Sequence, residues 1–228
     1  SYFFFCCVEL EDFVVEKPLC LGYKLFKQFR ELCEGKLKEG DSVAIFTHPC
    51  PDPDAIGSQM GLAWLLEKTY NVNVDMFISG QISHPQNLTM EKLLGPKLIP
   101  IEDYNSNNFL VDTIPSNAGR RDIVFDVVID HHVELPVANG DSHYLFINLH
   151  TGSACATIYG LIHYYGVVFD EEEVKDQNVA TSMLVGIYTD TCSLLGDRYT
   201  ESDREAYNDL FNYRNPESLR EIAQFKRP

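Results

Sequence analysis

The sequence predicts an α/β fold in which a doubly wound, mainly parallel sheet carries helices on both faces. Short, wholly apolar, β-prone runs such as residues 43–46 alternate with longer stretches of helical periodicity such as residues 19–38. Acidic and imidazole side chains follow the apolar runs, as at His48, Asp112 and Asp130. Because ligands of such sheets gather outside the carboxyl ends of the strands, the pattern predicts a functional site at that edge.

The N-terminal part of the chain predicts a helix, a strand and a second helix. Residues 19–38 place apolar side chains at the spacing of an amphipathic helix. Residues 43–46 form an apolar run typical of a central parallel strand, and this strand delivers His48 at its carboxyl end. The next helix is expected over residues 54–70, with Asp54 as its N-cap.

The alternation continues through the middle of the chain. Apolar and β-branched runs predict strands here, and two of them end at acidic residues. The expected elements are a strand over residues 72–78, a short helix over 89–94, and strands over 108–111, 123–129 and 144–149.

The C-terminal part is predicted to be helical. Gly152 and Ser153 are expected to start a helix, and acidic residues mark the first turn of the following one. The expected helices span residues 154–165, 171–188, 201–213 and 217–225. The chain is expected to divide into an N-terminal extension of unassigned role (1–18), the main domain (19–200) and a C-terminal helical segment (201–228).

The composition excludes several classes of protein. The chain has 228 residues, of which 45% are hydrophobic, enough for a substantial core, whereas its longest apolar stretch is too short to span a bilayer. The seven cysteines form no CxxC pair, so reduced thiols in a cytoplasmic protein are expected rather than a disulfide framework. The formal net charge of −16 disfavours long nucleic acids and favours small phosphorylated partners.

The candidate ligands differ in how strongly they indicate a site. Asp112 alone has an ordinary explanation, because aspartate closes many turns. His48, Asp52 and Asp54 are more specific, since they lie within one proline-stiffened loop that can hold ligands at little entropic cost. Adjacent histidines could be one core and one surface residue, but His131 directly follows an apolar strand and an aspartate, which favours a site. Carboxylates and imidazoles together suit divalent metals.

These residues resemble the DHH phosphoesterase superfamily, which includes RecJ-like exonucleases, nanoRNA phosphodiesterases, manganese pyrophosphatases and exopolyphosphatase-related proteins. Family motifs occur in the family's order over roughly residues 40–200. The matching residues are His48, Asp52, Asp54, Ala55, Gly57 and Ser58 in the first motif, Asp112 in the second, Asp130, His131 and His132 in the third, and Gly186, Ile187, Asp190 and Thr191 in the fourth.

The resemblance implies a role for each of these groups. His48 and Asp52 would bind a first metal, Asp54, His131 and Asp190 would bind a second, and Asp112 would bridge the two. His132 would face the scissile phosphate, and Asp130 would hold the histidine loop in place. Two divalent ions, Mn²⁺ in preference to Mg²⁺ or Co²⁺, can activate a water molecule and stabilise the attacking and leaving oxygens of a phosphoester.

Weaker signals indicate groups that could contact substrate. Gly152 and Ser153 at a helix start could present N–H groups to a phosphate, although a helix N-terminus needs such residues anyway. His84 and Asn87 resemble a polar loop found beside the site in some family members, or form a simple surface turn. Arg120 and Arg121 could meet a phosphate, or could be solvated.

Many members of this superfamily carry a C-terminal domain that clamps the substrate, and residues 201–228 show no such pattern. The resemblance therefore implies a single-domain member, a fragment of a longer protein, or a protein that takes its substrate clamp from a partner. A homo-oligomer or a separate clamping domain could supply that surface. The leading hypothesis is a Mn-dependent phosphoesterase that hydrolyses short nucleotides or other small phosphoesters. The alternatives are a nucleotide-binding regulatory module with little turnover, and a pyrophosphatase or exopolyphosphatase.

Overall fold

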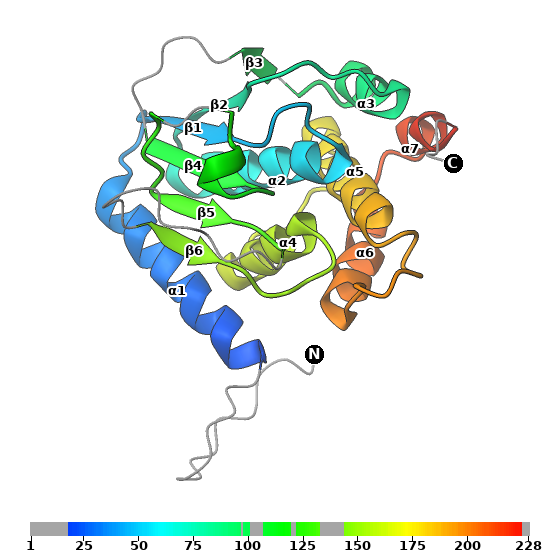
Figure 1. Cartoon of the computed structure of the whole chain (residues 1–228). Coiled ribbons are helices and arrows are strands. Elements are labelled where there is room, and N and C mark those ends of the chain that lie inside the picture. Colours follow the sequence, from blue (N-terminus) through cyan, green and yellow to red (C-terminus); the bar gives the residue numbers. More distant parts are fainter. Residues whose placement is uncertain (1–17, 97, 101–106, 120–121, 133–143, 225–228) are drawn as a thin grey trace, which may run out of the picture.

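The computed structural model describes residues 18–96, 98–100, 107–119, 122–132 and 144–224, and Figure 1 shows how their helices and strands are arranged. Residues 1–17 of the expected N-terminal extension lie outside the described residues, as do Arg120 and Arg121.

A six-stranded sheet with the strand order β3-β2-β1-β4-β5-β6 forms the centre of the fold. Each pair of neighbouring strands is parallel. The predicted α/β fold with a parallel sheet is therefore confirmed, and the order of its strands reverses direction between β1 and β4. Helices were expected on both faces, but the buried apolar side chains of the seven described α-helices belong to a single cluster on one face. The strands are β1 (Ser42–Phe46), β2 (Asn73–Ile78), β3 (Leu98–Pro100), β4 (Asn107–Val111), β5 (Val127–Ile129) and β6 (Leu145–Ile147).

The helices lie close to the ranges that the periodicity predicts. They are α1 (Pro18–Lys36), α2 (Pro53–Tyr70), α3 (Pro85–Leu94), α4 (Ala154–Tyr165), α5 (Val174–Asp190), α6 (Glu201–Tyr213) and α7 (Pro216–Ala223), with a short 3-10 helix η1 (Pro115–Asn117). Within the part of the chain that the structure describes, no helix has both the length and the apolar character that crossing a membrane would require.

The two faces of the sheet are covered differently. Alternate residues of β1 point to opposite faces, so Val43 and Ile45 join the larger apolar cluster while Ala44 and Phe46 join a smaller one. The described helices contribute their buried apolar side chains to the larger cluster. Figure 1 shows helix α2 behind the strands. The smaller cluster is closed by the segment between β4 and β5, which supplies Ala118, Ile123 and Phe125.

Several element boundaries differ from the prediction. The strand expected over residues 123–129 forms only as β5, because residues 123–125 lie outside the ladder and place Ile123 and Phe125 in the smaller cluster. Helix α3 begins at Pro85, where the His84 ring accepts from the N–H of Gln86 and proline fixes the first helical residue. The short edge strand β3 was not predicted.

Helix α2 is the central helix of the larger cluster, and its N-cap is a correction to the prediction. Asp52, not Asp54, caps it by accepting the N–H groups of Asp54 and Ala55, and Pro53 follows as the first helical residue. Asp54 is thereby freed from capping and lies fully buried in the first turn.

One side chain of α2 fastens the helix to the sheet. The buried amide of Gln59 donates to the carbonyls of Ile45 in β1, at 3.0 Å, and of Phe77 in β2, at 2.9 Å. Because both acceptors are buried, removing the donor leaves two carbonyl groups short of a partner.

Replacing Gln59 by leucine should therefore lower the free energy of unfolding by about 1–3 kcal/mol. Urea denaturation monitored by circular dichroism measures this change. Gln28→Leu on the exposed face of α1 is the matched control, and it should shift stability by no more than about 0.5 kcal/mol. Equal transition midpoints for the two variants would contradict the assigned role of Gln59.

Candidate metal centre

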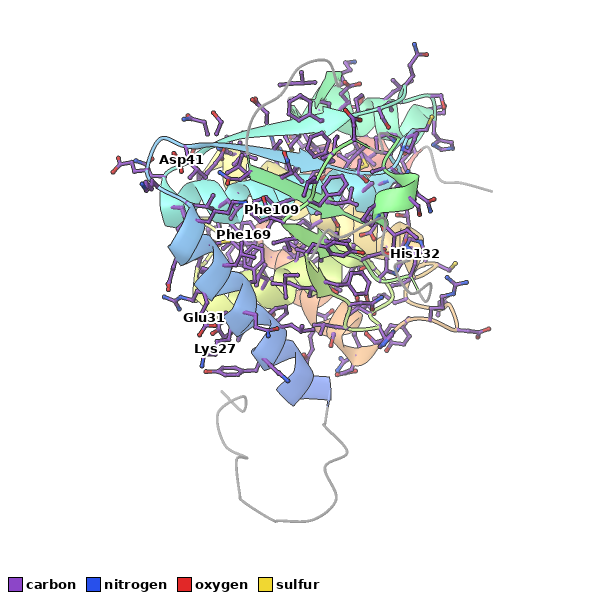
Figure 2. All side chains as sticks on the ribbon, turned by 60° about the vertical axis from the view of Figure 1, so that its left-hand side comes forward. Lys27, Glu31, Asp41, Phe109, His132 and Phe169 are labelled. Atoms are coloured by element: carbon purple, nitrogen blue, oxygen red, sulfur yellow. The ribbon has the colours of Figure 1, made fainter. Side chains whose placement is uncertain are left out.

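The candidate ligands meet at the carboxyl edge of the sheet, where its winding reverses. His48 follows β1 and Asp112 follows β4, and these two strands are neighbours. The His48 Nε2 atom lies 3.5 Å from Asp112 Oδ2. Figure 2 shows His132 on the side of the molecule opposite Asp41, the residue that precedes β1, so the site lies at the carboxyl edge alone. This is where open α/β sheets hold their ligands.

The loop after β1 presents one imidazole nitrogen and one carboxylate. The His48 Nδ1 atom donates to the carbonyl of Pro49 at 2.9 Å, which leaves Nε2 as the free ring nitrogen. That Nε2 atom lies 3.9 Å from Asp52 Oδ1. Asp52 is oriented by its capping bonds to α2, at 3.1 Å each. The backbone of the loop is held in turn by Asn87, whose amide donates to the carbonyl of Pro51 at 2.9 Å.

Asp54 is oriented by a different helix. Its two carboxylate oxygens accept the N–H groups of Ala154 at 2.7 Å and of Cys155 at 2.9 Å. These groups belong to the first turn of α4, whose N–H groups have no partner within the helix and favour an anion. A buried carboxylate is thus fixed in direction by backbone donors from a segment 100 residues away along the chain.

The His131 imidazole lies where three carboxylates converge. Its Nε2 atom is 3.6 Å from Asp54 Oδ2, 3.3 Å from Asp112 Oδ1 and 3.4 Å from Asp190 Oδ2. Asp190 is the last residue of α5, which extends slightly beyond the predicted end of the helix. The motif at residues 186–191 therefore places its aspartate on a helix end and not in a loop.

Asp112 lies between the two groups of ligands. Its Oδ2 atom faces His48 and its Oδ1 atom faces His131, at 3.5 Å and 3.3 Å. One set of ligand atoms within 4.8 Å of one another joins His48, Asp52 and Asp112, and a second joins Asp54, His131 and Asp190. These sets have the composition that the resemblance implies for two metals, with Asp112 able to face both.

The backbone at Asp112 is strained. Its φ angle of 56° lies in the left-handed region, which costs a residue with a side chain about 1–3 kcal/mol and persists only where the surroundings hold it. The Asp112 N–H group donates to the carbonyl of Ile129 at 2.8 Å, which ties this turn to the end of β5. Aspartate tolerates the left-handed region better than most residues, and asparagine does as well.

Asp130 organises the turn that carries both histidines. Its Oδ1 atom accepts the backbone N–H groups of His131 and His132, at 2.9 Å and 3.4 Å, and the His132 ring Nδ1 at 2.7 Å. Asp130 is fully buried, while 46% of the His132 side chain is exposed. With Nδ1 donating to Asp130, the Nε2 atom of His132 is left for a group at the mouth of the site.

Buried polar atoms without a hydrogen-bond partner lie among the candidate ligands. Among the described residues, Asp112 Oδ1, Asp130 Oδ2 and His131 Nε2 are buried atoms of this kind. Buried atoms of this kind also occur elsewhere in the described chain, so the position of these atoms among the candidate ligands is what favours a bound ion here. Two of them, Asp112 Oδ1 and His131 Nε2, face each other inside the ligand sets, so the residues present fit divalent metals.

Burial, together with crowding of the carboxylates, raises the pKa of two of them. Burial, followed by the charges of Asp112 and Asp190, raises the pKa of Asp52 to about 6. The same causes raise the pKa of Asp54 well above its usual range. Without a cation, both carboxylates take up a proton at a higher pH than an ordinary aspartate does.

The same carboxylates raise the pKa of two histidines, His48 and His131. Burial disfavours their charged forms, but Asp112 outweighs it and raises the pKa of His48 to about 9. Asp112 and Asp190 together outweigh burial at His131 and raise its pKa to about 11. Burial would raise the pKa of Asp112, yet its contacts with His131 and His48 lower it. Protons on the imidazoles therefore supply the positive charge that metals would supply.

The described residues that were predicted to contact substrate already have polar contacts within the protein. The Gly152 N–H group and the Ser153 hydroxyl already donate to Asp203, at 2.7 Å and 3.0 Å. Asn87 is buried in the first turn of α3, where it holds the loop after β1, and His84 caps that helix. A direct role of these residues in substrate binding stays a prediction.

Sequence reasoning missed at least one residue that shapes the site. The Asn148 amide donates to the carbonyl of His132 at 2.7 Å, and its oxygen accepts the N–H of His150 at 2.8 Å. Asn148 thus joins the histidine turn to the loop after β6. An asparagine directly after an apolar strand is common in turns, so its spacing alone gave no signal.

Two glycines of the motifs allow α2, α4 and α5 to approach one another beneath the ligands. A Cβ atom on Gly186 would lie 2.7 Å from Cys155 Sγ and 3.0 Å from the Cα atom of Asp54. A Cβ atom on Gly57 would lie 2.7 Å from the same sulfur. Since real Cβ atoms do not come so close, only glycine lets α5 bring Asp190 toward Asp54.

Comparison with known proteins identifies the class of this fold and site. A model described as the DHH family, N-terminal domain, matches residues 42–187. The chain therefore belongs to the DHH family.

Individual relatives agree with this assignment. An uncharacterized protein of Methanocaldococcus jannaschii is 30% identical over 193 residues, which cover 80% of this chain and 38% of that protein. An exopolyphosphatase-related protein from Bacteroides fragilis has a similar structure, with a TM-score of 0.70 and 17% identity over 90% of this chain and 61% of that one. A protein from Methanococcus jannaschii assigned to the family II inorganic pyrophosphatases gives a TM-score of 0.58 and 20% identity over 80% of this chain and 58% of that one. At these identities the two structures show a shared fold, and the chain spans only part of each of the three proteins.

Binding of divalent metal should release protons. With the pKa of His48 at about 9 and that of His131 at about 11, both imidazoles carry a proton at neutral pH in the metal-free protein, and a metal ligand must be neutral. Affinity for Mn²⁺ should therefore rise as pH rises from about 6 to about 9. Calorimetric titration in buffers of different ionisation enthalpy counts the protons released. His48→Gln should release about one proton fewer, and titrations that release no protons would contradict the assignment of these imidazoles as ligands.

Replacing Gly186 by alanine should push α5 away from α2 and α4. The added methyl group would meet Cys155 and Asp54, so we expect a loss of about 1–3 kcal/mol in the free energy of unfolding and weaker Mn²⁺ binding. Chemical denaturation and metal titration measure the two effects. Gly35→Ala in α1 is the matched control, because a Cβ atom there meets nothing within 4 Å and should not destabilise the protein. Unchanged metal affinity in the Gly186 variant would show that Asp190 does not depend on this close approach.

Proposed function

We propose that the protein is a metal-dependent phosphoesterase that hydrolyses short nucleotides or other small phosphoesters. The observation that carries this proposal is the position of Asp112, whose two carboxylate oxygens face one ligand set each. Membership of the DHH family supports the same class of activity. His48 and Asp52 would hold one ion and Asp54, His131 and Asp190 the other, with Asp112 between them.

Two divalent ions bound in this way would supply positive charge to the oxygens of a phosphoester and lower the pKa of an attacking water molecule. The mixture of carboxylates and imidazoles favours Mn²⁺ over Mg²⁺, because imidazole binds transition metals better, and Co²⁺ is a further alternative. The protein itself orients the side chains that would hold the metals. Helices α2 and α4 fix Asp52 and Asp54, and the Pro49 carbonyl fixes the His48 ring.

His132 is the group that we assign to the reacting phosphate. Contact with the Asp130 carboxylate is the main cause that raises the pKa of His132, so this ring is more readily protonated than an ordinary histidine. Its half-exposed ring lies against His131, with the ring centroids 4.3 Å apart. From there His132 can donate a hydrogen bond to a phosphoryl oxygen or transfer a proton to a leaving group, while Asp130 holds it in place.

Charge supports a small substrate. The chain has a formal net charge of −16, which repels long polyanions, whereas a short phosphorylated molecule can be bound at the metals themselves.

A pyrophosphatase or exopolyphosphatase activity is the second candidate, because the similar structures include proteins described in those terms. A nucleotide-binding module with little turnover is the third. A second copy of the chain or a separate domain would supply a substrate clamp.

Free thiols support a reducing location. Cys33, Cys50, Cys155 and Cys192 are free cysteines in the described part of the chain. Cytoplasmic proteins usually keep their cysteines in this form, so we propose a cytoplasmic location.

Asp112→Asn tests the mechanism directly. Asparagine keeps the shape of the side chain and tolerates the left-handed backbone, but it removes the charge between the two ligand sets. We expect kcat for a dinucleotide with Mn²⁺ to fall by at least about a hundredfold while the fold is kept. Asp41→Asn is the matched control, since Asp41 lies at the opposite edge of the sheet and should leave kcat unchanged.

A substrate panel separates the candidate functions. Wild-type protein with Mn²⁺ is compared on a dinucleotide, pyrophosphate and polyphosphate. Turnover of the dinucleotide that persists in Asp112→Asn would overturn the mechanism. Turnover of pyrophosphate or polyphosphate alone would overturn the substrate class, and nucleotide binding without any turnover would favour the regulatory module.

A further inference from the structure

We propose that Asp203 of α6 is a positioning residue for the metal centre, which it serves by fixing the loop that connects β6 to α4. This inference rests on the proposed function, since it concerns the same ligands. Asp203 lies outside the residues matched by the family model, 42–187, and no motif of the first section includes it. The contacts that suggest this role join distant segments and so exist only in the folded chain.

The Asp203 carboxylate is fully buried and makes contacts in two directions. Toward its own helix, its Oδ2 atom accepts the N–H and hydroxyl groups of Thr200, at 2.9 Å and 2.6 Å, which completes the capping box of α6. Toward the site, Oδ2 accepts the N–H of Gly152 at 2.7 Å and Oδ1 accepts the Ser153 hydroxyl at 3.0 Å. A residue that only capped α6 would not need the second set of contacts.

The contacts with Gly152 and Ser153 lead directly to Asp54. Ser153 is the N-cap of α4 and accepts the N–H of Ala156 at 3.2 Å. Ala154 and Cys155 directly follow Ser153, and their N–H groups donate to the Asp54 carboxylate. Asp203 therefore fixes the residues that begin the helix whose N-terminus orients a proposed metal ligand.

A second line of contact leads to Asp190. A Cβ atom on Gly152 would lie 2.9 Å from Thr191 Cγ2, 2.9 Å from Asp203 Oδ2 and 3.0 Å from the Arg198 carbonyl. The Gly152 backbone is thus packed between Asp203 and the residue that follows Asp190. Both Asp54 and Asp190 belong to the same ligand set with His131, so displacement of Gly152 would disturb that set from two sides.

The geometry singles out one of the two ligand sets. Asp203 supports Asp54 and Asp190, whereas the capping of α2 and the Pro49 carbonyl support the His48 and Asp52 set. Loss of the Asp203 charge should therefore weaken one metal more than the other. Residues that orient metal ligands from the next layer typically change metal affinity by about 10–100-fold.

Asp203→Asn is the test, and Asp209→Asn is its matched control. Asp209 lies on the same helix and also joins α6 to α4, through the Tyr159 hydroxyl at 2.8 Å, but it does not contact Gly152 or Ser153. Titration with manganese chloride, followed by calorimetry, measures the two binding steps. We expect Asp203→Asn to weaken one step by about tenfold or more and the other by less, and Asp209→Asn to change neither.

Amide hydrogen exchange in the metal-free protein gives an independent measurement. The Ala154 and Cys155 N–H groups should lose about tenfold of their protection in Asp203→Asn and keep it in Asp209→Asn, because only the first variant loosens their bonds to Asp54. If Asp203→Asn does not fold, Ser153→Ala replaces it, since this variant removes one of the two contacts toward the site.

The outcomes distinguish this inference from the proposed function. Wild-type protein that binds no Mn²⁺ would overturn the proposed function, and the inference would fall with it. Wild-type protein that binds two ions while a folded Asp203→Asn, or Ser153→Ala in its place, keeps both affinities and its amide protection would overturn the inference alone.

Discussion

Mutual repulsion among the carboxylates around Asp112 is the constraint on which the rest of the site depends. Asp52, Asp54 and Asp190 all lie near it, and burial removes the water that would screen their charges. The fold offsets the repulsion with fixed donors: the first turn of α4 for Asp54, the first turn of α2 for Asp52 and two imidazoles for Asp112. A charge arrangement of this kind costs stability unless a cation completes it, which is the physical reason to assign metals here.

Much of the fold could be predicted because its signals are local. The range 154–165 coincides with α4, and 201–213 with α6, since a serine or threonine N-cap marks the start of each helix and Gly166 marks the end of α4. Predictions failed where tertiary contacts override local pattern. Residues 123–125 have strand-like apolar character, but Ile123 and Phe125 close the smaller cluster. Asp54 has good capping chemistry, but Asp52 caps the helix two residues earlier.

The candidate site was predicted residue by residue only where chemistry and spacing coincide. His48, Asp112 and His131 follow apolar strands, and parallel strands bring such residues to one edge. Asn148 and Asp203 could not be found in this way. Each acts through a backbone group of another segment, Asp203 on a loop 51 residues distant, and no local pattern encodes such a contact. The same holds for the proximity of Gly186 to Asp54, which depends on how α5 packs across α2.

The central claim is that Asp112 lies between two metal ions. Anomalous diffraction at the manganese edge, from crystals grown with manganese chloride, tests it most directly. We expect two peaks about 3.5–4 Å apart, one beside His48 and Asp52 and one beside Asp54, His131 and Asp190, with the Asp112 carboxylate in contact with both. A single peak, or peaks that Asp112 does not contact, would contradict it.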